Sequence, residues 1–239
     1  MDVYNKNKPE TIKSMFGSIA KNYDRTNAIL SFQLHKLWNR RLVKETIGNN
    51  PGILADLCCG TGVITYAWLK NSKEKQQAYL IDFCPEMLEC AKIRAKEHNF
   101  EANHQLEYVT ADVQDIPLQA NSINFATMAY GIRNVQTPLR CFREVHRILK
   151  DGGTFGILEL TEPKNTVLRL GHGLYIRRVL PILGKMFASN QEAYQYLSSS
   201  IKSFIKPHEL TLLLKEAGFH DMETIPLAGG IATIISARK

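Results

Sequence analysis

The sequence predicts an α/β fold with a mostly parallel sheet and helices on both of its faces. From Gly52 to residue 160, short apolar runs alternate with amphipathic stretches, which is the pattern of repeated strand–helix units. The chain has 239 residues, 44% apolar and 22% charged, the balance of a globular protein with a large core. No apolar run approaches the roughly 18 residues of a membrane-spanning helix, and the N-terminus has no apolar signal-peptide region. We therefore expect a single domain over residues 1–239, neither exported nor inserted into a membrane.

The core of the predicted fold spans residues 51–160. Its expected strands are short apolar runs, residues 53–57, 78–83, 106–112, 122–132 and 154–160. The expected helices are one that the Gly-rich run at 60–62 opens and that ends at Leu69, one from Pro85, and one over residues 138–150. Strands that alternate with helices in this way form parallel pairs, so the carboxyl ends of the strands should share one edge of the sheet.

Three segments lie outside this core. Residues 1–50 are expected to form an N-terminal helical cap segment, and residues 161–206, helical in period and free of strand signals, a substrate cap inserted into the fold. Residues 207–239 are expected to form a helix and then two strands, 219–225 and 230–238, joined by a Gly-containing turn as an antiparallel hairpin.

The charge of the chain is unevenly distributed. The net charge is +7, yet the excess of basic residues lies in segments 1–50 and 161–206, each with five more Lys and Arg than Asp and Glu. Such segments suit an anionic lipid surface, nucleic acid or solubility alone. The five cysteines include no C-x-x-C pair and the seven histidines show no ligand spacing, so a reducing cytoplasm is expected and no metal site is indicated.

The first functional motif is the run from Asp56 to Gly62, at the end of the first expected strand. Glycines there let a ligand approach the backbone, and the following helix presents unpaired N–H groups. Position 65 is Thr65 where a dinucleotide fingerprint has its third Gly, which disfavours NAD. A purely structural turn is the alternative.

Two carboxylates follow at later strand ends. Asp82 closes the second expected strand, where an acid accepts hydrogen bonds from the ribose of a nucleoside ligand. Its alternative role is to cap the helix that begins near Pro85. Asp112 closes the third expected strand, where a carboxylate can receive an adenine amino group, although an isolated turn Asp would have no such meaning. Together the three strand ends have the order of a class I S-adenosylmethionine-dependent methyltransferase.

The resemblance extends to one family. From about residue 11 to the C-terminus, the chain resembles the demethylmenaquinone/ubiquinone C-methyltransferase family. Two runs are specific to that family, Gly-x-Arg-Asn-Val at 131–135 and Tyr-x-Tyr-Leu at 194–197, whereas the Gly loop is not. The other matching segments are residues 16–38, 56–62, 145–153, 158–163 and 217–234.

The resemblance implies a Rossmann-like class I methyltransferase fold and methylation of a ring carbon of a prenylated quinol. S-adenosylmethionine would be the methyl donor and S-adenosylhomocysteine the product. Demethylmenaquinol is the expected substrate, and the benzoquinol of the ubiquinone pathway is the alternative. Ala129 departs from the small polar residue of many relatives, which puts its side-chain contact in doubt. The implied cofactor-binding residues are Asp56, Cys58, Gly60, Thr61, Gly62, Asp82, Phe83, Asp112, Val113 and Ala129.

The reaction also requires a group that stabilises the ionised quinol. Arg133 and Asn134 follow the fourth expected strand and are the candidate catalytic residues, because a cation and an amide can hydrogen-bond a phenolate. A surface or ion-pair role is the alternative for Arg133. Tyr194, Tyr196 and Asn190 are the candidate substrate-binding residues, and Asn190 stands where the family usually has Asp.

Other interpretations stay open at this point. His35 and Trp38 are expected to pack within the cap, with no proton transfer assigned to His35. Another class I methyltransferase acting on a small phenol or on RNA, and a cofactor-binding regulator without catalysis, are the competing functions. No motif for nucleic acid is present.

Because the substrate has a prenyl tail, we expect transient contact with an anionic membrane surface through Arg177, Arg178 and Lys185, at the inner face of the membrane. The sequence leaves a homo-oligomer open.

Overall fold

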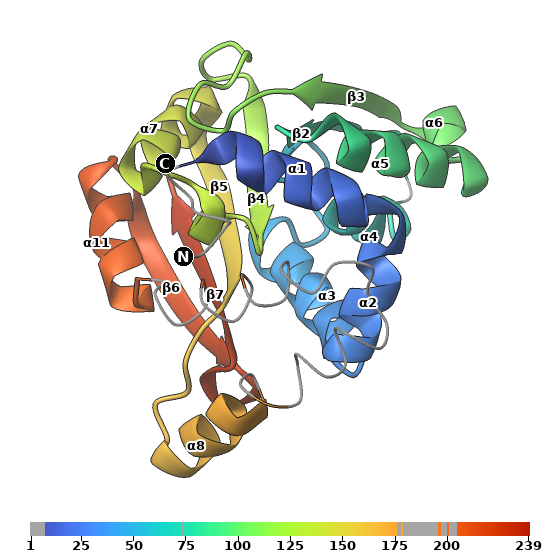
Figure 1. Cartoon of the computed structure of the whole chain (residues 1–239). Coiled ribbons are helices and arrows are strands. Elements are labelled where there is room, and N and C mark those ends of the chain that lie inside the picture. The colour runs from blue at the N-terminus through green and yellow to red at the C-terminus, as the bar shows by residue number, and fades with distance from the viewer. Residues whose placement is uncertain (1–7, 73, 176–177, 179–195, 197–199, 201–204) are drawn as a thin grey trace.

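The computed structural model describes residues 8–72, 74–175, 178, 196, 200 and 205–239. Its centre is one seven-stranded sheet in the order β3-β2-β1-β4-β5-β7-β6 (Figure 1). The strands are β1 (Ile53–Leu57), β2 (Gln77–Asp82), β3 (Gln105–Thr110), β4 (Ile123–Ala129), β5 (Leu149–Leu160), β6 (His220–Leu227) and β7 (Ala232–Arg238).

The described helices flank this sheet. They are α1 (Pro9–Ile19), α2 (Tyr23–Leu30), α3 (Leu34–Thr46), α4 (Val63–Leu69), α5 (Pro85–Glu97), α6 (Phe100–Asn103), α7 (Pro138–Ile148), α8 (Thr166–Leu174) and α11 (Pro207–Glu216). Short 3-10 helices are η1 (Ala20–Asn22), η2 (Ile132–Asn134) and η4 (Ala228–Gly230). Proline begins α5, α7 and α11, where its missing N–H costs no hydrogen bond.

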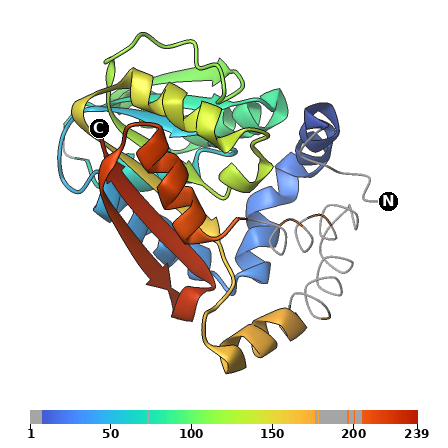
Figure 2. The same cartoon turned by 90° about the vertical axis from the view of Figure 1, so that its left-hand side faces the viewer.

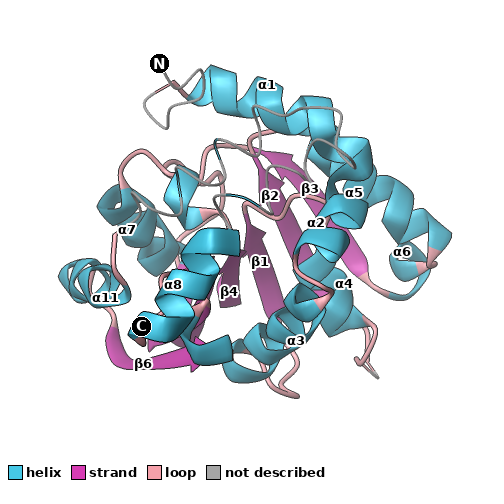
Figure 3. Cartoon of the chain, turned by 60° about the horizontal axis from the view of Figure 1, so that its bottom comes forward, coloured by secondary structure: helices cyan, strands magenta, loops and turns pink. Residues whose placement is uncertain are grey.

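The predicted fold class is confirmed. Strands β1 to β5 pair in parallel, whereas β7 runs antiparallel to both β5 and β6, so the C-terminal hairpin lies at one side of a parallel sheet. The parallel strands therefore end at a common edge. Helix α1 crosses beside the ends of β2 and β3 at that edge (Figure 3).

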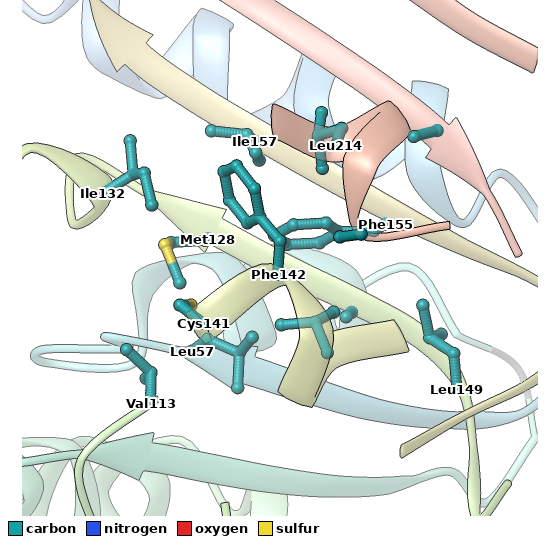
Figure 4. Packing of buried hydrophobic residues seen from close by; sticks show 14 of the residues in the cluster. Leu57, Val113, Met128, Ile132, Cys141, Phe142, Leu149, Phe155, Ile157 and Leu214 are labelled. Atoms are coloured by element: carbon teal, nitrogen blue, oxygen red, sulfur yellow. The ribbon is translucent and has the colours of Figure 1, made fainter. Parts of the chain in front are cut away.

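The two faces of the sheet hold two separate cores. On one face α7 and α11 lie together (Figure 2), and their apolar residues pack on β1, β4 and β5. Figure 4 shows this cluster, in which the rings of Phe142 and Phe155 pack edge to face with 6.0 Å between their centroids. On the other face α3, α4 and α5 pack on the same strands. Successive residues of a strand point to opposite faces, and accordingly Leu54 lies in the second core and Ala55 in the first.

The structure corrects several element boundaries. The fourth strand ends at Ala129 rather than at residue 132, because Tyr130 adopts a left-handed φ of 58° and η2 follows. The fifth strand begins at Leu149 rather than at residue 154. Helix α6 was not predicted. Of segment 161–206, the structure describes α8 as helical, and most of the remaining residues lie outside the described ranges, so the inserted cap stays a prediction.

Candidate active site

Two cavities adjoin at the carboxyl edge of the sheet. The first lies over the ends of β1, β2 and β4 and has an empty volume of about 780 Å³ including its open mouth. The second is lined largely by α2, α3 and α8 and has about 1390 Å³ of empty volume, measured in the same way. Both cavities are lined by Tyr23 and Tyr130. Two ligands held in these cavities would thus meet at a shared aromatic wall.

The loop after β1 forms the floor of the first cavity. Cys58, Gly60 and Gly62 all have positive φ, at 50°, 54° and 77°. A Cβ on Gly62 would lie 2.6 Å from the ring of Tyr66, whereas a Cβ on Gly60 would meet nothing within 4 Å. Gly62 is therefore required by packing, and Gly60 leaves its backbone open to a ligand.

The carboxylate of Asp82 is fixed beside this loop. Its Oδ2 accepts from Gly60 N at 2.8 Å, and its Oδ1 accepts from Cys84 N at 2.9 Å. Burial raises the pKa of Asp82, and the backbone hydrogen bonds oppose that effect. Each oxygen retains acceptor capacity toward the cavity, which Asp82 lines. This arrangement fits the two hydroxyls of a ribose and shows that Asp82 also organises the chain before α5.

Four further predicted residues line the same cavity, and they are Phe83, Asp112, Val113 and Ala129. Asp112 is exposed and accepts from Gln114 N at 2.9 Å. Val113 is buried in the first core and also lines the cavity. Carboxylate, backbone and apolar side chains at one edge fit a purine base. The residues present therefore suit a nucleoside ligand such as S-adenosylmethionine.

Three predicted cofactor residues, Asp56, Thr61 and Gly62, lie next to residues of the cavity without lining it. The buried Asp56 carboxylate accepts from Thr65 Oγ1 at 2.8 Å and from Thr127 Oγ1 at 2.9 Å, which links α4 to β4. Burial raises the pKa of Asp56 to about 6. Thr61 Oγ1 donates to Asp24 Oδ1 at 2.8 Å and thereby ties the Gly loop to α2. Their predicted cofactor contacts remain predictions.

The candidate catalytic residues lie between the two cavities. Arg133 lines the second cavity and Asn134 the first. Arg133 is buried, and its Nη1 lies 2.5 Å from Oε1 of Glu159 on β5, which is also buried. Among the residues that the structure describes, none accepts a hydrogen bond from Arg133 Nε. The ion pair raises the pKa of Arg133 against the opposite effect of burial, so the guanidinium stays charged.

One of the predicted substrate residues joins this group. Tyr196 OH donates to Asn134 Oδ1 at 2.8 Å, and the ring packs with Ile12, Met15 and Leu30 of the N-terminal segment. Tyr196 therefore connects the chain after α8 to both the loop after β4 and the N-terminal helices. Tyr194 and Asn190 lie outside the described residues.

Three residues of the site were not predicted from the sequence. Tyr23 and Tyr130 form the shared wall, and Glu159 holds Arg133. A signal for Glu159 was present, because a charged residue within the apolar run 154–160 must find a partner when the strand is buried. No comparable local signal existed for the tyrosines, since their meeting depends on how α2 packs against the loop after β4.

Comparisons with known proteins agree with this geometry. The model of the ubiE/COQ5 methyltransferase family matches residues 3–239. A demethylmenaquinone methyltransferase of Protochlamydia amoebophila is 51% identical over 240 residues, covering 100% of this chain and 99% of the relative. One of Chlamydia caviae is 39% identical and covers 98% and 97%. A solved methyltransferase of Aquifex aeolicus, described as SAM-dependent, is 18% identical with a TM-score of 0.60, covering 83% of this chain and 88% of its own.

Proposed function

The chain belongs to the ubiE/COQ5 methyltransferase family and is an S-adenosylmethionine-dependent methyltransferase, and from this premise we propose that it methylates a ring carbon of a prenylated quinol. The preferred acceptor is demethylmenaquinol, because the relatives reported above are named for demethylmenaquinone. One observation supports the proposal above others. An apolar cavity adjoins the nucleoside-type cavity, and the two share the wall formed by Tyr23 and Tyr130.

The residues of the chain divide the work of this reaction. S-adenosylmethionine supplies a methyl group bonded to a positively charged sulfur. Asp82 and Asp112 hold the nucleoside and so fix the direction of transfer. Arg133 stabilises the phenolate of the acceptor, since it lines the second cavity and its guanidinium stays charged beside Glu159. Electron density from the phenolate then reaches the adjacent ring carbon, which becomes the nucleophile.

The remaining polar residues of the site position other groups and do not stabilise the charge of the phenolate. Asn134 is held by Tyr196, so its amide faces the first cavity in one orientation. We assign to Tyr194 and Asn190 contacts with the quinol or its tail. Segments 1–50 and 161–206 together would cover the acceptor, and the ring contact of Phe32 with Tyr175 at 6.1 Å supports that pairing.

A prenylated acceptor also requires access to a membrane. None of the helices in the described part of the chain is long and apolar enough to cross a bilayer. Some apolar side chains are exposed instead. Phe32, which lines the second cavity, is 70% exposed, and Val167 and Leu170 are 77% and 70% exposed on α8, the helix whose Gly171 and His172 line the same cavity. Helix α8 projects beyond the end of the β6–β7 hairpin (Figure 1). These features support a transient peripheral contact in which the apolar residues enter the lipid surface.

Liposome co-sedimentation tests this contact. Phe32→Ser with Leu170→Ser should weaken binding to all vesicles, whereas Arg177→Gln with Arg178→Gln and Lys185→Gln should weaken binding to anionic vesicles only. Each basic residue near an anionic surface contributes about 1 kcal/mol. Binding that is insensitive to lipid charge and to both sets of substitutions would exclude these residues as the contact.

The activity itself is tested by labelled methyl transfer. Purified protein, labelled S-adenosylmethionine and demethylmenaquinol in detergent should yield labelled menaquinol, and the methyl group should be on carbon. The ubiquinone-pathway benzoquinol, assayed in parallel, decides whether that substrate is accepted too. If neither quinol is labelled and the methyl group is instead transferred to RNA or to a simple phenol, the protein is a methyltransferase for that other acceptor and the proposal is wrong.

A further inference from the structure

His35 lines the second cavity, and one nitrogen of its ring already has a hydrogen-bond partner. The residue stands in the first turn of α3, and its Nδ1 lies 2.5 Å from Ser31 Oγ. The same Ser31 hydroxyl donates to the carbonyl of Asn27 at 2.7 Å. A short chain therefore runs from the backbone of α2 through Ser31 to the imidazole.

This chain determines the tautomer of His35. A serine hydroxyl has a single hydrogen, and here that hydrogen is donated to Asn27 O. With that hydrogen directed to Asn27 O, Ser31 Oγ accepts from the imidazole, so we assign the ring proton to Nδ1. In the neutral ring, Nε2 then has the free lone pair. The hydrogen bond through Nδ1 holds the ring in place and leaves Nε2 as a proton acceptor.

The surroundings keep the ring neutral. Burial and the neighbouring Lys36 lower the pKa of His35, against the opposing effect of Asp24. The other charged or titratable groups that line the cavity are Tyr23, Asp24, Tyr130, Arg133, His172 and Tyr175. A neutral imidazole in an apolar cavity is the form that accepts a proton at neutral pH.

Most of these other groups are poorly suited to accept a proton. Burial raises the pKa of both Tyr23 and Tyr130, so these phenols remain protonated. Arg133 is charged already. The Asp24 carboxylate is engaged by Arg94 and by Thr61 Oγ1. His172 shares the cavity, and burial lowers its pKa also, but no hydrogen bond between described residues fixes its ring.

We propose that His35 is the general base of the reaction and that its Nε2 accepts the hydroxyl proton of the bound quinol. The proposal rests on the quinol C-methyltransferase function above. The O–H bond breaks, and its electron pair raises the density at the adjacent ring carbon, which forms the new carbon–carbon bond to the methyl group. The electron pair of the broken carbon–sulfur bond stays on sulfur. The methylated carbon then loses its hydrogen as a proton while the oxygen regains one, so one proton in total leaves through His35 to solvent.

His35→Gln is the first test. We expect kcat to fall by about 100-fold or more, the usual range for loss of a general base, with the KM for quinol and the affinity for S-adenosylmethionine changed by less than about threefold. In the wild type, kcat should fall as pH drops through the lowered imidazole pKa, and this acidic limb should be absent in the variant. His208→Gln, an exposed histidine on α11, is the matched control and should behave as the wild type.

Chemical rescue separates proton transfer from structure. Imidazole added to His35→Ala should restore part of the lost kcat, in proportion to the fraction of free base, whereas it should not restore Arg133→Met. Ser31→Ala should lower kcat less than His35→Gln and keep the acidic limb, because Ser31 is a positioning residue.

Two results would overturn the assignment. One is a folded His35→Gln enzyme with kcat within about threefold of wild type; the other is loss of the acidic limb in His172→Gln but not in His35→Gln. If the wild type methylates no quinol, the proposed function fails first. If the wild type does so and the His35 variants match it, only the general base is refuted.

Discussion

Removing the carboxylate of Glu159 should destabilise the protein more than any loss of packing at that position explains. The side chains of Arg133 and Glu159 are only 6% and 2% exposed, and their contact is 2.5 Å. Glu159 Oε1 also accepts from Leu160 N at 2.8 Å. In Glu159→Leu the guanidinium stays charged and buried while its counter-charge is gone.

The magnitude follows from the burial of both groups. Removal of one partner of a buried pair costs about 3–5 kcal/mol, because it leaves an uncompensated charge. Replacement of both partners by apolar residues of similar size is often neutral or stabilising. We therefore expect Glu159→Leu and Arg133→Met each to lower the free energy of unfolding by about 3–5 kcal/mol, and the double variant to lie within about 1–2 kcal/mol of the wild type.

Urea denaturation of the four proteins measures this coupling, and the methyl-transfer assay measures its consequence. The double variant should be stable yet inactive, since no cation then faces the phenolate. Glu159→Gln should keep the hydrogen bond from Leu160 N and lose less stability than Glu159→Leu. Additive losses in the double variant would refute the coupling, and an active double variant would refute the role of Arg133.

Three further predictions concern the cofactor side. Asp82→Ala should weaken S-adenosylmethionine binding by about 1.5–3 kcal/mol in calorimetry; unchanged affinity in a folded variant would limit Asp82 to organising the backbone. Gly131→Ala should destabilise by about 1–3 kcal/mol in urea, because its Cβ would lie 2.5 Å from Cys58 Cβ, and Cys58→Gly should relieve the loss; no relief would exclude the clash. The raised pKa of Asp56, about 6 against 3.8, means that the native state binds the extra proton more tightly than the unfolded state does. The free energy of unfolding should therefore fall by about 2 kcal/mol as pH rises from about 4 to about 6, and by about 3 kcal/mol in total from about pH 3 to about pH 7; Asp56→Asn should remove that contribution.

Patterns that are local in the sequence predicted the sheet well. An apolar run flanked by turn residues is enough to place a parallel strand, and all five core strands were predicted within a few residues. The errors occurred at positions where tertiary contacts decide the backbone conformation. Tyr130 ends β4 with a left-handed φ that no propensity predicts. Leu149 to Gly153 look like a helix end and a turn, yet Ile123 pairs with Leu149 and so extends β5.

The candidate site divides in the same way. The predicted cofactor residues Asp82, Asp112 and Gly60 lie at the end of a strand or shortly after it, and a parallel sheet brings such positions to one edge whatever lies between them. The sequence could therefore identify them singly. For Arg133 the ion-pair interpretation is confirmed, because Nη1 pairs with the buried Glu159; the residue also lines the second cavity, and its catalytic role stays a prediction.

No comparable rule predicts the lining of the second cavity from the sequence. Its wall combines α2, the start of α3, the loop after β4, the end of β5 and helix α8, segments that no single periodicity relates. His35 illustrates the consequence, because an isolated histidine on an amphipathic helix has no distinguishing pattern. Its meaning depends on Ser31 and on the carbonyl of Asn27, which together leave Nε2 as the acceptor. Residues that line the first cavity could thus be predicted from strand ends, whereas the proposed acceptor chemistry depends on hydrogen bonds that only the folded chain specifies.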